Sequence, residues 1–135
     1  MLFLNRALIS WRSRLQKVVS LSSAEAEFYA CSEAVKEIPF VIQILEFLGI
    51  EAQRPVDVMV DNIGVIHMSQ NQMSSSRTRH MDTRCHYVND LQDNGAKVRF
   101  IRSEDNASGI ATKNVTGEIF KKHEDRVVAD RDYWK

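Results

Sequence analysis

Residues 56–68 read VDVMVDNIGVIHM, and the local pattern changes halfway along this stretch. The segment from Val56 to Val60 is mostly apolar and β-branched, which favours a strand near the centre of a sheet. Asp61 ends that strand, and residues 62–68 continue with a pattern typical of a helix. A strand that passes directly into a helix predicts an α/β sheet with helices packed on its faces.

Upstream, the sequence predicts two consecutive helices. Ser22, followed three residues later by Glu25, is a capping box, in which the hydroxyl and the carboxylate exchange bonds with the backbone. An Ala-rich helix should then run to Lys36. Pro39 lacks an N–H and should break or restart it, and Gly49 is expected to end the second helix as its C-cap.

The remaining elements follow from composition and periodicity. Residues Leu2 to Trp11 are rich in strand formers, so we expect strand structure there with a turn at Asn5-Arg6. We expect a second strand over Lys17–Leu21. Downstream, the sequence predicts a polar loop (69–76), a helix (78–93), a half-buried strand (96–102) and short helices beginning near Asn106 and Thr116.

Composition indicates one globular domain. The chain has 135 residues, of which 44% are hydrophobic and 27% charged. The apolar start, Met1 to Leu4, is cut short by Asn5, and no segment approaches the length of a signal peptide or a membrane span. We therefore expect an intracellular protein, in the cytoplasm or nucleus, whose Cys31 and Cys85 are buried thiols. The oligomeric state cannot be predicted.

The overall charge does not indicate a nucleic-acid partner, because 18 basic residues balance 18 acidic ones. Two local clusters are basic: Arg12 and Arg14 lie in one, and Arg77 and Arg79 in the other. These arginines are candidate phosphate contacts, with a solvated surface as the alternative. Trp11 is a candidate for stacking on a base, although a position in the core or on a sheet face is the favoured interpretation.

Two acidic residues are candidate metal ligands. Asp61 follows a strand at its carboxyl end, where ligands gather in open α/β sheets, although it would also suit the N-cap of the next helix. Glu25 is occupied by the capping box. Glu27 points roughly the other way, among small apolar neighbours, where a carboxylate is costly unless a cation meets it; the alternative is a surface glutamate. Carboxylates are the ligands that Mg²⁺ prefers.

Three ordered blocks of the sequence resemble one family. Residues 9–30 (ISWRSRLQKVVSLSSAEAEFYA), Asp61-Asn62 after a strand, and residues 76–87 (SRTRHMDTRCHY) look like the ribonuclease H domain of Ty1/copia-type retrotransposon polyproteins. The resemblance extends from about Phe3 to Lys113. It implies a ribonuclease H-like mixed sheet flanked by helices, over residues 1–125, followed by a charged tail over residues 126–135.

The resemblance also implies a chemistry. The family cuts the RNA strand of an RNA·DNA hybrid with two magnesium ions, which Mn²⁺ can replace, held by four acidic residues. Glu27 would be the helix glutamate and Asp61 the strand-end aspartate, and Asn62 would lie beside the nucleic acid. Residues 106–113 read NASGIATK, so Gly109 stands where the family has its final aspartate.

The resemblance places the family's first aspartate, and the central strand that carries it, upstream of residues 3–5. Two of the four acids therefore have no counterpart in residues 1–135. Arg6-Ala7 after Asn5 also replaces a glycine-rich hairpin turn, so we expect no tight turn with positive φ there.

These observations lead to the hypothesis that the chain is a remnant of a retrotransposon ribonuclease H domain, inactive alone. The alternatives are a nuclease rebuilt with a partner strand or with Mn²⁺, and a co-opted module that binds nucleic acid or protein without catalysis.

Overall fold

The computed structural model describes residues 1–17, 19–70, 86–90, 92 and 95–127. The chain divides into two compact units. Residues 19–101 form one, the central unit, and residues 1–18 together with 102–135 form the other, the terminal unit. Because the units are separate bodies, each is described by itself.

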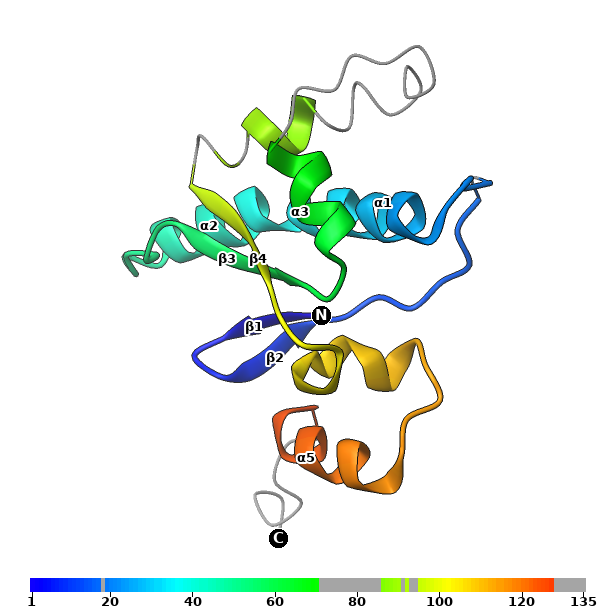
Figure 1. Ribbon diagram of the computed structural model, residues 1–135. Helices are drawn as coiled ribbons and strands as arrows, with labels where there is room; N and C mark the ends of the chain where they lie inside the picture. Colours follow the sequence, from blue (N-terminus) through cyan, green and yellow to red (C-terminus); the bar gives the residue numbers. More distant parts are fainter. Residues whose placement is uncertain (18, 71–85, 91, 93–94, 128–135) are drawn as a thin grey trace, which may run out of the picture. The chain divides into compact units, whose positions relative to one another are not determined.

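The central unit has an α/β architecture. Its elements are α1 (Ser23–Val35), α2 (Glu37–Phe47), β3 (Val56–Val60), α3 (Ile63–Gln70) and β4 (Ala96–Phe100), and residues 86–90 are also helical. Strands β3 and β4 pair in parallel, with Val56 opposite Ala96 and Val60 opposite Phe100. Figure 1 shows the helices flanking this small sheet. The expected α/β class is confirmed, and the arrangement is compatible with a ribonuclease H-like fold.

The helix boundaries of the central unit follow the expected capping residues. Ser22 Oγ accepts a hydrogen bond from the Glu25 amide at 3.1 Å, so the capping box starts α1. The chain restarts as α2 after Lys36, with Pro39 in the first turn, where a missing N–H costs nothing. Gly49 has φ +73° and ends α2, with the Ile50 amide bonded back to the Leu45 carbonyl.

The apolar core lies in the central unit, between the sheet and its helices. Residues from α1, β3, α3 and β4 converge there because each element presents one apolar face. The buried cluster consists of Phe28, Cys31, Val35, Ile38, Val60, Val65, Val88, Ala96 and Val98.

The terminal unit combines a hairpin with short helices. It contains β1 (Leu2–Leu4), β2 (Ala7–Ser10), the 3₁₀ turns η1 (Ser103–Asp105) and η2 (Ala107–Ala111), and α5 (Gly117–Val127). Strands β1 and β2 are antiparallel, and α5 packs against η2 and β2. The expectation that the tight turn would be lost is wrong: Asn5 and Arg6 both have positive φ, 48° and 71°. Asparagine tolerates this region well, and pairing of the strands holds Arg6 in it.

The expected strand over Lys17–Leu21 does not form. Its described residues have no regular structure, and the side chains of Val19 and Leu21 are 86% and 81% exposed. A β-branched pair favours extended backbone, but a strand also needs a neighbour to take its hydrogen bonds. Among the described residues, β1 pairs with β2 and β3 with β4, so the expectation that β3 is central is also not met.

Other expectations are met in part. Ser69 and Gln70 belong to α3 rather than to a loop, and the rest of the expected loop lies outside the described residues. Of the helix predicted over residues 78–93, residues 86–90 are described and are helical. The expected helix at Asn106 is the 3₁₀ turn η2, capped by Asn106. None of the helices in the described residues has the length and apolarity needed to span a membrane.

Candidate functional site

Glu27 lies in the second turn of α1, where its side chain is half-buried. The neighbouring Glu25 is buried, and its Oε2 accepts a hydrogen bond from the Leu21 amide at 2.7 Å. Glu25 therefore closes the start of the helix, as the sequence predicted, although it bonds to Leu21 rather than to the N-cap residue itself. This separates a structural glutamate from Glu27, which the capping box leaves available for a ligand.

Asp61 lies at the carboxyl end of β3, half-buried, directly after the buried Val60. The alternative role considered for it, capping the next helix, belongs to Asn62 in the structure. The Asn62 Oδ1 accepts a hydrogen bond from the Gly64 amide at 2.8 Å. Asn62 thus has a structural role at the start of α3, and a contact between Asn62 and nucleic acid stays a prediction.

The elements that carry Glu27 and Asp61 are in contact. Helix α1 packs against both β3 and α3. One such contact is close: a Cβ placed on Gly64 would lie 2.9 Å from the Cβ of Ala24. Ala24 precedes Glu27 by three residues, and Gly64 follows Asp61 by three residues. The fold therefore brings together two regions that are far apart in the sequence, at the carboxyl end of β3 (Figure 1).

The donor set of this region suits a hydrated magnesium ion. Mg²⁺ usually binds one or two carboxylates and keeps several waters or substrate phosphates, so a pair of carboxylates such as Glu27 and Asp61 has suitable chemistry for one ion. The described residues contain no group of three or more acidic, histidine or cysteine side chains able to hold a metal. The site in the central unit is therefore smaller than the four-acid site that the resemblance implies.

Gly109 lies in η2 of the terminal unit. A Cβ built on it meets nothing within 4 Å. A Cβ therefore fits at this position without a steric clash, although Gly109 is a buried residue.

Arg12 and Arg14 are exposed in the terminal unit, in a segment without regular structure. Ser13 Oγ donates a hydrogen bond to the Ala111 carbonyl at 3.1 Å, which ties the segment to η2. Trp11 is 68% exposed, so the favoured interpretation of it as a core or sheet-face residue is wrong. The reason is local: β2 ends at Ser10, so Trp11 has no sheet face to cover. Arg77 and Arg79 lie outside the described residues.

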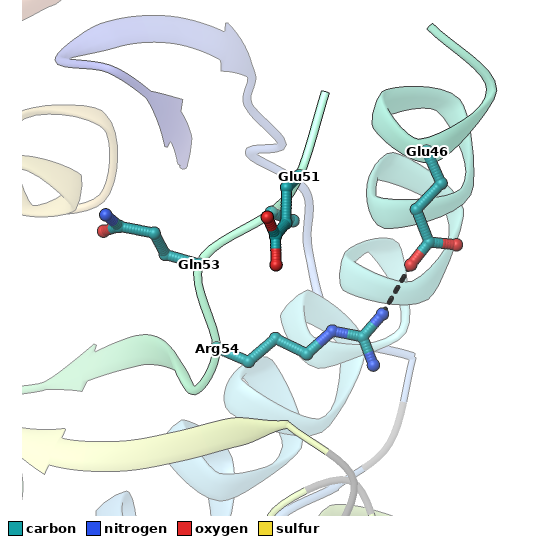
Figure 2. Close-up of a pocket in the computed structure, with 5 residues that line it drawn as sticks. Glu46, Glu51, Gln53 and Arg54 are labelled. Atoms are coloured by element: carbon teal, nitrogen blue, oxygen red, sulfur yellow. Dashed lines mark hydrogen bonds and ion pairs between the residues drawn. The ribbon is translucent and has the colours of Figure 1, made fainter. Parts of the chain in front are cut away.

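One shallow pocket lies elsewhere in the central unit. Figure 2 shows it between the end of α2 and the loop before β3, lined by Glu46, Glu51, Ala52, Gln53 and Arg54. Arg54 Nη2 donates to Glu46 Oε1 at 2.7 Å, so the two side chains neutralise each other. The pocket lies at the amino end of β3, whereas Asp61 lies at its carboxyl end. Five residues of strand, about 17 Å, separate the two places.

Two features of the structure are not visible in the sequence pattern. His123 is fully buried on α5, although its neighbours in KKHED are charged and suggest a solvated face. The close approach of Ala24 and Gly64 had only one signal, a glycine in the first turn of a helix.

Burial raises the pKa of the Cys31 thiol to about 12, so Cys31 is protonated near neutral pH and is not a nucleophile.

Comparison with known proteins shows relatives along most of the chain. It is 37% identical, over 114 residues and 84% of its length, to the retrovirus-related Pol polyprotein from transposon TNT 1-94 of Nicotiana tabacum. It is 28% identical over 91% of its length, and 29% identical over 84%, to the corresponding polyproteins from transposons RE1 and RE2 of Arabidopsis thaliana. The chain spans 8% of each of these relatives. No protein-family model and no solved structure matches the chain.

Proposed function

This chain is homologous to a segment of the retrovirus-related Pol polyproteins of plant transposons, and we propose that it is a remnant of their ribonuclease H-like domain, inactive on its own. The observation that carries the proposal is the packing of α1, which bears Glu27, against the junction of β3 and α3, which begins with Asp61. Two carboxylates from distant parts of the sequence thus lie on contacting elements, at the edge of the sheet where ligands bind in α/β folds.

Glu27 and Asp61 would together hold one Mg²⁺ or Mn²⁺ ion in this proposal. When bound, such an ion supplies charge for a phosphate of the RNA strand and lowers the pKa of a bound water. The two carboxylates fix the place of the ion and, because both are half-buried, limit the number of waters around it. Both side chains act by position and charge, and neither forms a covalent bond.

Gly109 accounts for the loss of activity in this proposal. The resemblance puts a metal-binding aspartate at this position, and glycine supplies no ligand. With at most two carboxylates from the described part of the chain, the site supports one ion. A reaction that depends on two ions would then lack one of them.

Cleavage of an RNA·DNA hybrid tests the proposal directly. We expect no metal-dependent cleavage in Mg²⁺ or Mn²⁺ by the chain or by its Glu27→Ala variant. Gly109→Asp, in a chain extended upstream by the preceding segment of the tobacco relative, should show cleavage that Glu27→Ala or Asp61→Asn abolishes. Glu33→Ala on the same helix and Asp57→Asn on the same strand are charge-matched controls and should leave that cleavage intact.

Cleavage by the original chain that is lost in Glu27→Ala would contradict the proposed inactivity. An extended Gly109→Asp chain that folds but does not cleave would contradict the assignment of the metal-binding residues.

A second candidate function is binding of nucleic acid without catalysis. It is favoured by the exposure of Trp11 next to Arg12 and Arg14, because an aromatic side chain among cations stacks on bases while the arginines contact phosphates. Salt dependence of hybrid binding tests it. Arg12→Ala combined with Arg14→Ala should weaken binding and lower the salt slope by about one to two.

Arg54→Ala combined with Arg99→Ala is the charge-matched control for this binding experiment, because both arginines lie in the central unit, away in sequence from the Trp11 segment. Binding that is equally weakened by this control would point to net charge rather than to a surface around Trp11.

A further inference from the structure

Helices α1 and α3 approach each other so closely at Gly64 that there is no room for a Cβ atom there. A Cβ on Gly64 would lie 2.9 Å from the Ala24 Cβ and 3.0 Å from Asn62 Oδ1. Real Cβ atoms essentially never come this close, and the Ala24 Cβ is fixed to the helix backbone and cannot rotate away. Any side chain at Gly64 therefore requires α1 or α3 to move.

The contact faces the candidate metal ligands. On a helix, residues three apart lie on the same side, so the side of α1 that touches Gly64 also carries Glu27. Gly64 is the second residue of α3, and Asp61 lies three residues before it, where β3 ends. A change in the separation of the two backbones at Ala24 and Gly64 would therefore also change the separation of the backbones at Glu27 and Asp61.

Local preference does not explain a glycine here. Gly64 is not among the residues with positive φ, so its backbone is accessible to alanine. Alanine is also the better helix former. By these criteria an alanine would be favoured, and the space between the two helices is the feature that requires glycine.

We propose that Gly64 and Ala24 are positioning residues of the metal site, and that the missing side chain at Gly64 sets the distance between the Glu27 and Asp61 carboxylates. The inference rests on the proposed function, because it assigns the metal to these two side chains. A metal ion bound by only two protein ligands depends strongly on their spacing, because each must reach it at about 2.0–2.1 Å. Outer residues that orient metal ligands typically change metal affinity by about 10–100-fold.

The test moves one Cβ between the two helices. Gly64→Ala adds it on α3, Ala24→Gly removes it from α1, and the double variant exchanges the two. Gly117→Ala is the matched control, because it adds a Cβ to a glycine in the first turn of α5 with nothing within 4 Å. Mn²⁺ binding is followed in the full chain by paramagnetic broadening of backbone amide signals around Glu27 and Asp61. Urea unfolding is measured for every variant.

We expect Gly64→Ala to weaken Mn²⁺ binding by about 10-fold or more, and the double variant to recover most of that loss. Gly117→Ala should bind like the original chain, and Ala24→Gly is the reference with which the double variant is compared. If Gly64→Ala does not fold, the double variant decides the question. A double variant that folds and binds Mn²⁺ supports the proposal, and one that does not overturns it. A recovery of affinity is not expected from a change in stability alone, which the urea midpoints report separately.

Three other results are informative. If Gly64→Ala binds Mn²⁺ as tightly as the original chain, the positioning inference is overturned but the proposed metal site is not. A double variant that stays as weak as Gly64→Ala shows that the Ala24 contact does not position the ligands, and overturns it as well. If Glu27→Gln shows the same Mn²⁺ broadening as the original chain, the proposed metal site is overturned, and the positioning role is overturned with it.

Discussion

The central and terminal units differ in what fills their interiors. Apart from Ala107, every buried apolar side chain among the described residues lies in the central unit, where Phe28, Val35, Val65 and Val88 are almost completely inaccessible. In the terminal unit the largest buried side chain is His123. Its Nε2 donates to the Glu104 carbonyl at 3.0 Å, while its Nδ1 has no hydrogen-bond partner in the structure.

This difference bears on the candidate functions. Burial of apolar surface is the main stabilising term in a small domain, and a buried polar atom without a partner opposes it. Among the described residues each unit has one such atom, Asn89 Oδ1 in the central unit and His123 Nδ1 in the terminal unit, so the units differ in the amount of apolar burial. The central unit therefore has the means to hold Glu27 and Asp61 at a fixed spacing. The terminal unit carries Gly109, Arg12 and Arg14. It buries fewer apolar side chains, so we expect it to unfold locally more easily than the central unit.

The largest effect is expected at Phe28, which is fully buried in the core of the central unit. Phe28→Ala should lower the free energy of unfolding of that unit by about 3–5 kcal/mol, because it removes apolar contacts and leaves a cavity. Urea unfolding, read together with amide hydrogen exchange, measures the loss. Phe120→Ala, on the half-exposed face of α5, is the control and should cost much less. Equal loss of protection in both units would show that they unfold as one body.

His123 tests the interior of the terminal unit. His123→Ala should destabilise that unit by about 2 kcal/mol through the cavity it leaves. His123→Leu keeps the volume and removes the unpartnered Nδ1, so it should stay within about 1 kcal/mol of the original chain. Hydrogen exchange of the α5 amides provides the measurement. If leucine is as damaging as alanine, the bond to the Glu104 carbonyl, rather than volume, stabilises α5.

The capping box gives a smaller effect, confined to the central unit. Ser22→Ala removes the acceptor for the Glu25 amide and should cost about 1 kcal/mol. Ser108→Ala is a suitable control, because the hydrogen bonds at Ser108 use its backbone amide and carbonyl. Thermal unfolding monitored by circular dichroism compares the two. A Ser22→Ala variant as stable as the original chain would mean that Glu25 alone is sufficient to start α1.

The smallest effect concerns the exposed pair of Asp105 and Lys122, whose Oδ1 and Nζ atoms are 2.5 Å apart. The hydrogen bond from Lys122 lowers the pKa of Asp105 below its ordinary value of 3.8. Because the pKa is lower in the folded chain, the pair stabilises it above pH 3.8, and this contribution is lost as the pH falls through the folded value. Lys122→Met should raise the Asp105 pKa toward 3.8, which an NMR titration of the carboxyl group measures. An unchanged value would exclude Lys122 as the cause.

Much of the central unit could be predicted from the sequence because its signals are local. The capping box at Ser22, the restart at Pro39 and the glycine at the end of α2 each depend on a few neighbouring residues, and all three are found in the structure. The strand over residues 56–60 and the helix after Asp61 follow from composition in the same way. The roles of Glu27 and Asp61 in metal binding remain predictions.

Features that depend on partners far along the chain could be found only in the tertiary structure. Val18-Val19 has the preference of a strand, but whether a strand forms depends on a neighbouring backbone, and none pairs with the described residues there. Trp11 is exposed because β2 ends one residue before it, and His123 is buried because α5 packs on η2 and β2. The sequence by itself determined where α1 begins, where α2 restarts and ends, and where β3 passes into α3, since short-range hydrogen bonding and local composition set these points. The tertiary structure decided which side chains are buried and which elements touch, because burial and contact depend on residues separated by long stretches of chain.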